Sequence, residues 1–270
     1  MTPDATQRMP VGFVSHGAPT LALDVESGAD FRTWARTLPA PRAVLAISAH
    51  WLDAPPTLGT RERRPLLYDF GGFPEELDSV QYDAPVAADL AADLQRRLPD
   101  LERDDTRPWD HGVWVPLLHM YPRADVPILQ VSLPYRWTPR QIFEFGRRLA
   151  PLRREGVLVL GSGGAVHNLG RLDWGSGAMP ATVMPPTVMP PTWATDFEDW
   201  VRERLAAGAV DDVVAFREKA PAVRLAHPTD EHFLPLLVGL GAASETPAAV
   251  RFPISGFELG SLSRLAVQWG

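Results

Sequence analysis

The chain has 270 residues, of which 45% are hydrophobic and 22% charged, a composition typical of a globular protein with a sizeable core. Its formal net charge of −7 argues against the clustered basic surface that nucleic-acid binding needs. Because cysteine is absent, disulfides, thiolate metal sites and a cysteine nucleophile are excluded, so any metal must be held by nitrogen or oxygen ligands.

The N-terminal segment, MTPDATQRMPVGFV, lacks the basic region, the apolar stretch and the small-residue cleavage site of a secretory signal. The longest apolar runs are far shorter than the roughly 18 residues that suggest a membrane span. We therefore expect a cytoplasmic protein with no membrane partner.

Short apolar or β-branched runs predict strands, and segments with apolar residues three and four apart predict helices. A central, mostly parallel sheet flanked by helices on both sides is the expected α/β fold, with residues 1–270 as a single catalytic domain because no composition break marks a linker. In chain order the predicted elements are a strand at Val11–Val14, a strand at Ala43–Ser48, a helix at Ala84–Leu98, a strand at Val126–Leu133, a helix at Pro139–Leu152, a strand at Gly156–Leu160, a helix at Trp193–Ala207 and a strand at Val250–Ile254.

A proline-rich stretch at 179–192 is predicted to be an insertion loop. It contains the tandem repeat TVMPPTVMPP at 182–191, and such proline repeats favour extended backbone with few hydrogen bonds. Two interpretations stay open: a lid or oligomer contact, or a duplicated surface insertion without a function.

Three of the seven histidines follow predicted strands: His16 after VGFVS, His50 after AVLAISA and His167 after VLVLGSGGAV. In open α/β sheets ligands bind beyond the carboxyl ends of the strands. Any one such histidine is most often structural, but three in the same topological position favour a metal site. Neutral imidazole suits Fe, Zn, Cu or Ni.

The segment AHPTDEHFLPLL, residues 226–237, carries two more histidines, His227 and His232. Their spacing of five would not place them on one face of a helix. Pro228 restricts His227 to an extended conformation, so His227 is free to turn inward from a loop. Thr229 or Asp230 is predicted to cap a helix that begins near Glu231.

The other chemically notable positions have competing interpretations. His111, beside the turn residues of WDHG, either faces the cleft or caps the next helix, whereas His119 within an apolar element is expected to be structural. The glycine-rich run 161–164 lacks both GxGxxG and a GK[ST] ending, so tight backbone packing is preferred over phosphate binding. Neither Ser15 nor Ser48 lies in a G-x-S-x-G elbow, which argues against a hydrolase triad.

Six motifs in order along nearly the whole chain resemble the class III extradiol ring-cleavage dioxygenases, in the branch of the 4,5-DOPA dioxygenases and their bacterial relatives. The motifs are SHGAP at 15–19, SAHW at 48–51, YDFGGFPEELDSVQYDAP at 68–85, DHGVWVPL at 110–117, GSGGAVHNL at 161–169 and HPTDEHFLPLL at 227–237.

The resemblance implies a non-haem Fe(II), with Zn(II) as an alternative occupant, and a catechol-type substrate together with O2. By position, it implies metal ligation by His16, His50 and His227, a catalytic or additional metal-contacting role for His167, and a place lining the pocket for His111. Better-known class III enzymes have a glutamate where His227 matches. Three neutral ligands leave a divalent metal with its full charge. Such a site favours a catecholate but is also compatible with zinc, so the identity of the metal stays open.

On this interpretation His167 serves as the acid and base, and His111 orients substrate or oxygen, while the ring opens to a semialdehyde acid. A zinc hydrolase using the same histidines is one rival, and a non-catalytic metal-binding interaction protein of the same fold is the other. The sequence leaves the natural substrate and a homo-oligomeric state open.

Overall fold

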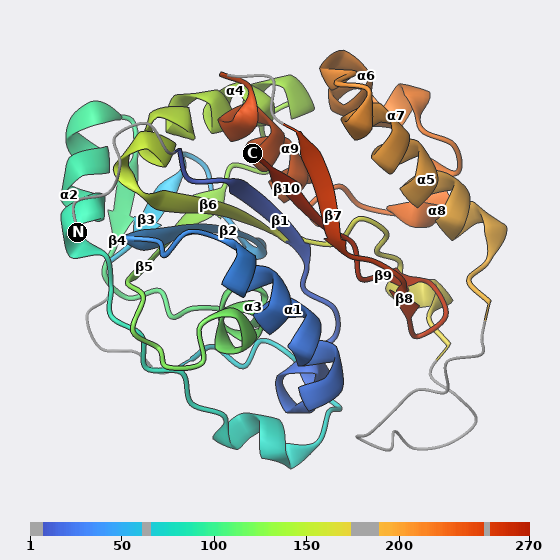
Figure 1. The fold of residues 1–270 in the computed structure, drawn as a ribbon, viewed down its shortest axis with the longest axis horizontal. Coiled ribbons are helices and arrows are strands. Elements are labelled where there is room, and N and C mark those ends of the chain that lie inside the picture. Colours follow the sequence, from blue (N-terminus) through green and yellow to red (C-terminus); the bar gives the residue numbers. More distant parts are fainter. Residues whose placement is uncertain (1–7, 61–65, 174–188, 246–248) are drawn as a thin grey trace.

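An eight-stranded sheet crosses the middle of the computed structural model, which describes residues 8–60, 66–173, 189–245 and 249–270 (Figure 1). The strands are β1 (Val11–Ser15), β2 (Ala43–Leu52), β3 (Thr57–Gly59), β4 (Glu102–Asp104), β5 (Ile128–Leu133), β6 (Val157–Gly163), β7 (Val250–Ile254), β8 (Phe257–Glu258), β9 (Leu262–Ser263) and β10 (Ala266–Trp269). The sheet has the order β4-β3-β5-β2-β6-β1-β10-β7, and β8 and β9 form a separate ribbon.

The inner strands β5, β2, β6 and β1 run parallel to one another, whereas β3 pairs with β5 and β10 pairs with β1 in antiparallel fashion. Their carboxyl ends therefore meet at one edge, where ligands bind in open α/β sheets.

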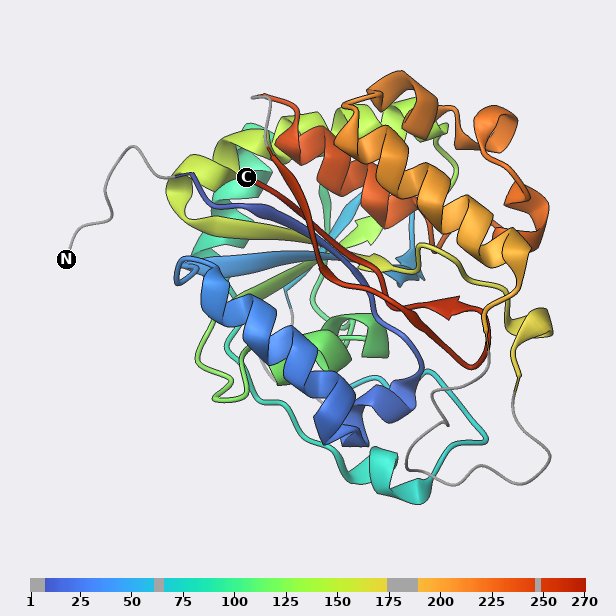
Figure 2. The same cartoon turned by 45° about the vertical axis from the view of Figure 1, so that its right-hand side comes forward.

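Helices cover both faces of the sheet (Figure 2). The α-helices are α1 (Val25–Thr37), α2 (Ala88–Arg97), α3 (His111–Met120), α4 (Pro139–Leu149), α5 (Thr192–Ala206), α6 (Val210–Val214), α7 (Phe216–Lys219), α8 (Val223–Ala226) and α9 (Leu234–Ala243). Short 3₁₀ segments are η1 (Pro19–Leu23), η2 (Glu75–Ser79), η3 (Ala150–Glu155) and η4 (Leu169–Arg171).

The alternation of side chains along the strands divides the core in two. In β1, Val11 and Phe13 pack in the cluster that contains the buried faces of α2, α4, α5 and α9. Val14 points to the opposite face, where Trp34 of α1 and Trp114 of α3 pack. Every one of these five side chains is at most 3% exposed, so the sheet is buried on both faces.

The predicted fold class is confirmed: a mostly parallel sheet lies between two helical layers. All five predicted strands are present, and so are the helices predicted at Ala84–Leu98, Pro139–Leu152 and Trp193–Ala207. β2 continues past Ser48 to Leu52, so His50 lies within the strand and does not follow it. The unpredicted strands β3, β4, β8, β9 and β10 have at most four residues each, too few to show a hydrophobic period.

The start of α9 differs from the prediction. The helix begins at Leu234, and its N-cap residue, Phe233, makes no side-chain cap hydrogen bond. Asp230 contributes its backbone carbonyl, which accepts from the Phe233 N–H in the turn before the helix, while its side chain forms an ion pair with Arg217. The expected capping by Thr229 or Asp230 is therefore wrong.

Most of the proline-rich stretch 179–192 lies outside the described residues, so its role as an insertion stays a prediction. Within the described parts of the chain, no helix has the length and apolar character needed to cross a lipid bilayer.

Candidate metal centre

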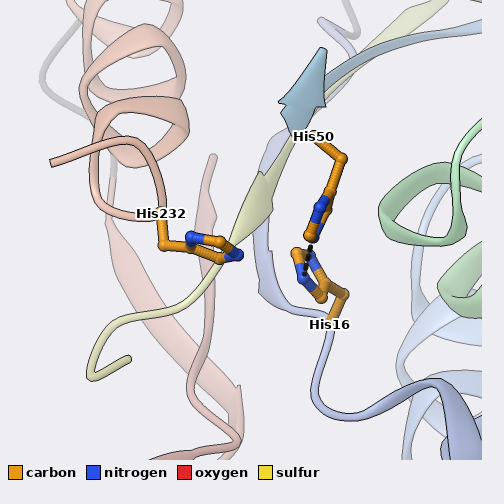
Figure 3. Close-up of side chains that lie close together, drawn as sticks. All are labelled: His16, His50 and His232. Atoms are coloured by element: carbon orange, nitrogen blue, oxygen red, sulfur yellow. Dashed lines mark hydrogen bonds between the residues drawn. The ribbon is translucent and has the colours of Figure 1, made fainter. Parts of the chain in front are cut away.

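Three histidine rings from distant parts of the chain converge at the carboxyl-end edge of the sheet (Figure 3). His16 follows β1, His50 lies near the end of β2, and His232 lies just before α9. One ring nitrogen of each lies within 4.8 Å of the others, and Nε2 of His16 and Nε2 of His50 are 3.1 Å apart. The three rings have the proximity that a shared metal ion requires.

Backbone hydrogen bonds hold two of these histidines in place. The N–H of His16 donates to the Gly163 carbonyl at 3.0 Å, which ties the end of β1 to the end of β6. The carbonyl of His50 accepts from Arg107 at 2.8 Å, and the His50 N–H donates to Ser48 Oγ at 3.1 Å. Ser48 in turn donates to the fully buried carboxylate of Asp110 at 2.6 Å.

The hydrogen bonds around Ser162 fix the tautomer of His16. The Ser162 hydroxyl donates its hydrogen to the carbonyl of Gly112. Its oxygen, 3.0 Å from Nδ1 of His16, must therefore accept from an N–H on that nitrogen. Because a neutral imidazole carries one proton, Nε2 of His16 is left with a free lone pair.

Carboxylates lie beside Nδ1 of the other two rings. Oδ2 of Asp69 is 3.4 Å from Nδ1 of His50, and Oε1 of Glu231 is 3.1 Å from Nδ1 of His232. A carboxylate favours a proton on the nitrogen that faces it, so Nε2 is the free atom in both rings. For His232 this atom is buried and has no hydrogen-bond partner among the described residues.

Three lone pairs thus point at one region from neutral rings. Burial is the largest cause that lowers the pKa of His50 to about 4, and burial followed by the neighbouring histidines lowers the pKa of His16 and His232 well below the usual value. A proton is therefore a poor occupant of this region near neutral pH. A metal cation satisfies all three nitrogens at once.

His111 and His167, both expected at the site, lie beside the three rings. His111 opens α3, and its ring centroid is 4.0 Å from that of His50. His167 stacks on His232 with centroids 3.4 Å apart and planes 5° from parallel. Burial first, then the charge of His227, lowers the pKa of His167 to about 3, so its ring is neutral.

The structure does not bring His227 to the cluster. Its ring packs between Phe197 and Phe233, with centroids at 5.2 and 5.3 Å, and its Nε2–H donates to the Ala165 carbonyl at 2.9 Å. The side chain is completely buried and fastens the loop after β6 to the loop before α9. The structure thus places His232, and not the expected His227, beside His16 and His50, and the ring of His227 lies apart from this cluster.

The expectations for His119 and the glycine run are met. The Nε2–H of His119 donates to the Leu21 carbonyl at 2.7 Å, away from the cluster. A side chain at Gly161 or Gly163 would collide with the carbonyl oxygen of Pro235 or His232. The glycines therefore let His232 and the first turn of α9 pack directly on β6, as tight packing requires.

His232, Asp69 and Glu231 are the residues that the sequence interpretation did not assign. The sequence that follows His232 could have indicated its position. The ten residues Leu234–Ala243 are apolar or glycine, and all of them are buried. A helix that is apolar all round must pack against the sheet. The residue just before such a helix is thereby brought to the sheet's edge. No comparable signal marks Asp69, which reaches the site from an irregular segment.

Low pH is expected to destabilise the metal-free protein through these buried rings. For His50 and His227 the folded pKa is about 4, below the unfolded value of about 6.5, so the unfolded state binds more protons between these values. Stability is complete above pH 6.5 and falls as the pH approaches 4. Each of these two histidines is expected to lower the free energy of unfolding by roughly 2 kcal/mol at pH 5 relative to pH 7. Urea unfolding of chelator-treated protein at pH 7 and at pH 5 measures this loss of stability. Equal free energies of unfolding at the two pH values would contradict the prediction.

Comparisons with known proteins identify the family of this chain. Residues 15–261 match the family described as the catalytic LigB subunit of aromatic ring-opening dioxygenase. The chain is 37% identical to the 4,5-DOPA dioxygenase extradiol of Escherichia coli (strain K12), covering 98% of this chain and 96% of that protein. The identity is also 37% with the protein of the same name from Beta vulgaris, over 88% of each.

A solved structure has the same fold. A crystal structure of an uncharacterized protein from Escherichia coli K12 superposes with a TM-score of 0.78 at 33% identity, covering 97% of this chain and 100% of the other.

Proposed function

This chain belongs to the LigB family of aromatic ring-opening dioxygenases, and we propose that it cleaves a catechol-type ring in the extradiol manner, using a metal held by His16, His50 and His232. Both atoms of O2 enter the product, and the C–C bond beside one hydroxyl-bearing carbon breaks to give a semialdehyde acid. The ring supplies all the electrons, so no further reductant is needed.

The convergence of three imidazole lone pairs carries this proposal. Nε2 of His16 and Nε2 of His50 lie 3.1 Å apart, and the group that faces each Nδ1 favours a proton there, which leaves lone pairs on the two Nε2 atoms. The buried Nε2 of His232 also needs a partner. Imidazole suits both Fe(II) and Zn(II), but zinc has no redox chemistry, so iron is the metal that fits this reaction.

A bound Fe(II) supplies a Lewis acid that favours the ionised catechol and a redox centre through which ring electrons reach O2. The three histidines contribute no charge to it. The negative charges nearby include those of Asp69 and Glu231, which face Nδ1 of His50 and of His232, and that of Asp110, which also acts on His50. The divalent charge that the neutral histidines leave on the metal favours an anionic substrate.

His167 is the proposed acid and base. No hydrogen bond of its ring to another described residue competes for its nitrogens, and the stack on His232 holds the ring beside the proposed ligands. Its ring is neutral in the ligand-free protein, so its nitrogens are free to take a proton from a substrate hydroxyl and return it later. An anionic substrate beside it raises its pKa from this low value toward the range that proton transfer needs.

Aromatic side chains support a planar substrate. Phe70 lies edge-on to His111 at 5.7 Å between centroids and equally close to Phe73. An edge-on wall of this kind suits an aromatic ring. Because the curated relatives are named for 4,5-DOPA cleavage, DOPA is the first substrate to test.

Oxygen uptake tests the proposal. Protein purified without oxygen and loaded with Fe(II) is expected to consume about one O2 per DOPA or catechol, with a coloured semialdehyde product. Zinc-loaded protein is the matched control and should consume none. If the iron-loaded protein leaves oxygen and every catechol untouched, the proposal fails. Ester hydrolysis by the zinc form alone would support the hydrolase rival.

A further inference from the structure

One carboxylate, that of Asp69, lies between two of the site histidines and comes from an irregular segment, residues 66–74, between β3 and η2. Its Oδ1 accepts from the backbone N–H of His111 at 3.1 Å and lies 2.8 Å from Nδ1 of the same residue. Its Oδ2 lies 3.4 Å from Nδ1 of His50. Asp69 thus faces both rings with acceptor atoms only.

Hydrogen bonds anchor the two residues that precede Asp69. The Leu67 N–H donates to the Trp109 carbonyl at 2.8 Å, and the Leu67 carbonyl accepts from the Trp114 indole at 3.3 Å. The Tyr68 hydroxyl donates to the Val80 carbonyl at 2.7 Å. The two bonds of Leu67 join the segment to the start of α3, which begins with His111. The carboxylate is therefore positioned before any ligand arrives, as a supporting group must be.

We propose that Asp69 is a positioning residue that fixes His50 and His111 in the same tautomer, with the proton on Nδ1 and the lone pair on Nε2. The effect of these tautomers on metal and substrate binding rests on the proposed function. His50 then offers Nε2 to the metal, and His111 offers Nε2 to a substrate hydroxyl as an acceptor and not as a donor. No hydrogen bond to another described residue occupies Nε2 of His111.

A direct ligand role for Asp69 is the competing explanation, because His50, Asp69 and His111 also form a group of closely spaced metal-binding atoms. The hydrogen bonds argue against it. Oδ1 already faces two N–H groups of His111, and Oδ2 faces the nitrogen of His50 opposite to the one in the three-histidine cluster. A metal bound to Asp69 would have to displace these protons.

Asp69→Asn gives the sharpest test because an amide cannot accept hydrogen bonds on both sides. Its NH2 group must face one of the two histidines as a donor, which forces that ring to move its proton to Nε2. The matched control is Asp83→Asn, which removes the same charge from an exposed residue further along the chain. Asp69→Ala removes the acceptor without introducing a donor. In this variant the rings of His50 and His111 are expected to populate both tautomers.

Nitrogen NMR of the imidazole rings in chelator-treated protein reads the tautomers without any activity assay. In the wild type and in Asp83→Asn, His50 and His111 should both carry the proton on Nδ1. In Asp69→Asn one of them should carry it on Nε2. Competition with a coloured chelator without oxygen should then show Fe(II) binding about 10- to 100-fold weaker than in the wild type, the usual effect of losing a supporting group.

The outcomes separate the two proposals. A wild type with the proton on Nε2 of His50 or His111 overturns the inference before any variant is made, as does an Asp69→Asn protein with unchanged tautomers. Weaker metal binding with unchanged tautomers would identify Asp69 as a ligand. If the tautomers switch as expected but wild-type protein neither binds Fe(II) nor consumes oxygen, the positioning role holds and the proposed dioxygenase function fails.

Discussion

Replacing His232 by glutamine is expected to empty the metal site and reduce ring opening to background, whereas the same change at His227 should leave the metal in place. His232 provides one of three imidazole donors, and an amide oxygen is a far weaker ligand for a divalent transition metal. His227 instead turns its ring toward the Ala165 carbonyl and two phenylalanine rings. Its loss should cost roughly 1–3 kcal/mol of stability, the cost of a disturbed buried hydrogen bond.

Metal content after anaerobic loading with Fe(II) and desalting distinguishes the two variants, and urea unfolding measures the stability of each. His119→Gln serves as the control, since His119 bonds to Leu21 away from the cluster. It should keep about one metal per chain, as the wild type should. A His232→Gln protein that retained full metal, or a His227→Gln protein that folded but lost it, would refute the proposed ligand set.

The second large effect is expected for His167→Gln, which should retain iron and bind catechol but turn over roughly 10² to 10⁴ times more slowly, the usual contribution of a positioned acid–base group. Glutamine preserves part of the volume and hydrogen bonding of the ring but cannot shuttle a proton. His167 stacks on His232 and is not one of the three clustered donors, so iron binding should change little.

An anaerobic titration of His167→Gln with Fe(II), followed by a catechol and then oxygen, separates binding from turnover. Asp83→Asn, changed at an exposed carboxylate, provides the matched folded control. Near-normal turnover at high iron concentration would show that His167 acts chiefly as a metal ligand. Normal turnover at ordinary iron concentration would show that it has no catalytic role.

Much of the fold and part of the site could be predicted from local pattern. The strand at Val11–Val14 and the strand that begins at Gly156 are continuous apolar runs, which are typical of strands buried on both faces. Parallel strands bring their carboxyl ends to one edge, so His16, at the end of β1, was placed correctly. Helix α3 was harder because it is apolar all round and contains Pro116, so it shows no amphipathic period.

The spacing of His227 and His232 in the sequence does not show which of them joins the cluster, because tertiary contacts decide this. Both lie in one short loop, and which ring faces the cluster is decided by the bond from His227 to Ala165 and by the packing of Phe233. Asp69 presents the same difficulty. Its partner His111 is 42 positions away in sequence, and only the folded chain brings the two together.

The glycines of β6 have a consequence for how this sequence can diverge. Gly161 and Gly163 carry no functional group, yet a methyl group on Gly161 would collide with the carbonyl of Pro235 in α9, and one on Gly163 with the carbonyl of His232. Helix α9 lies against both α4 and β6 and has no room to retreat. In a saturation mutagenesis screen selected for ring opening, these two positions should therefore be as intolerant of substitution as the histidines, since the space they leave empty is what lets a third imidazole reach the site.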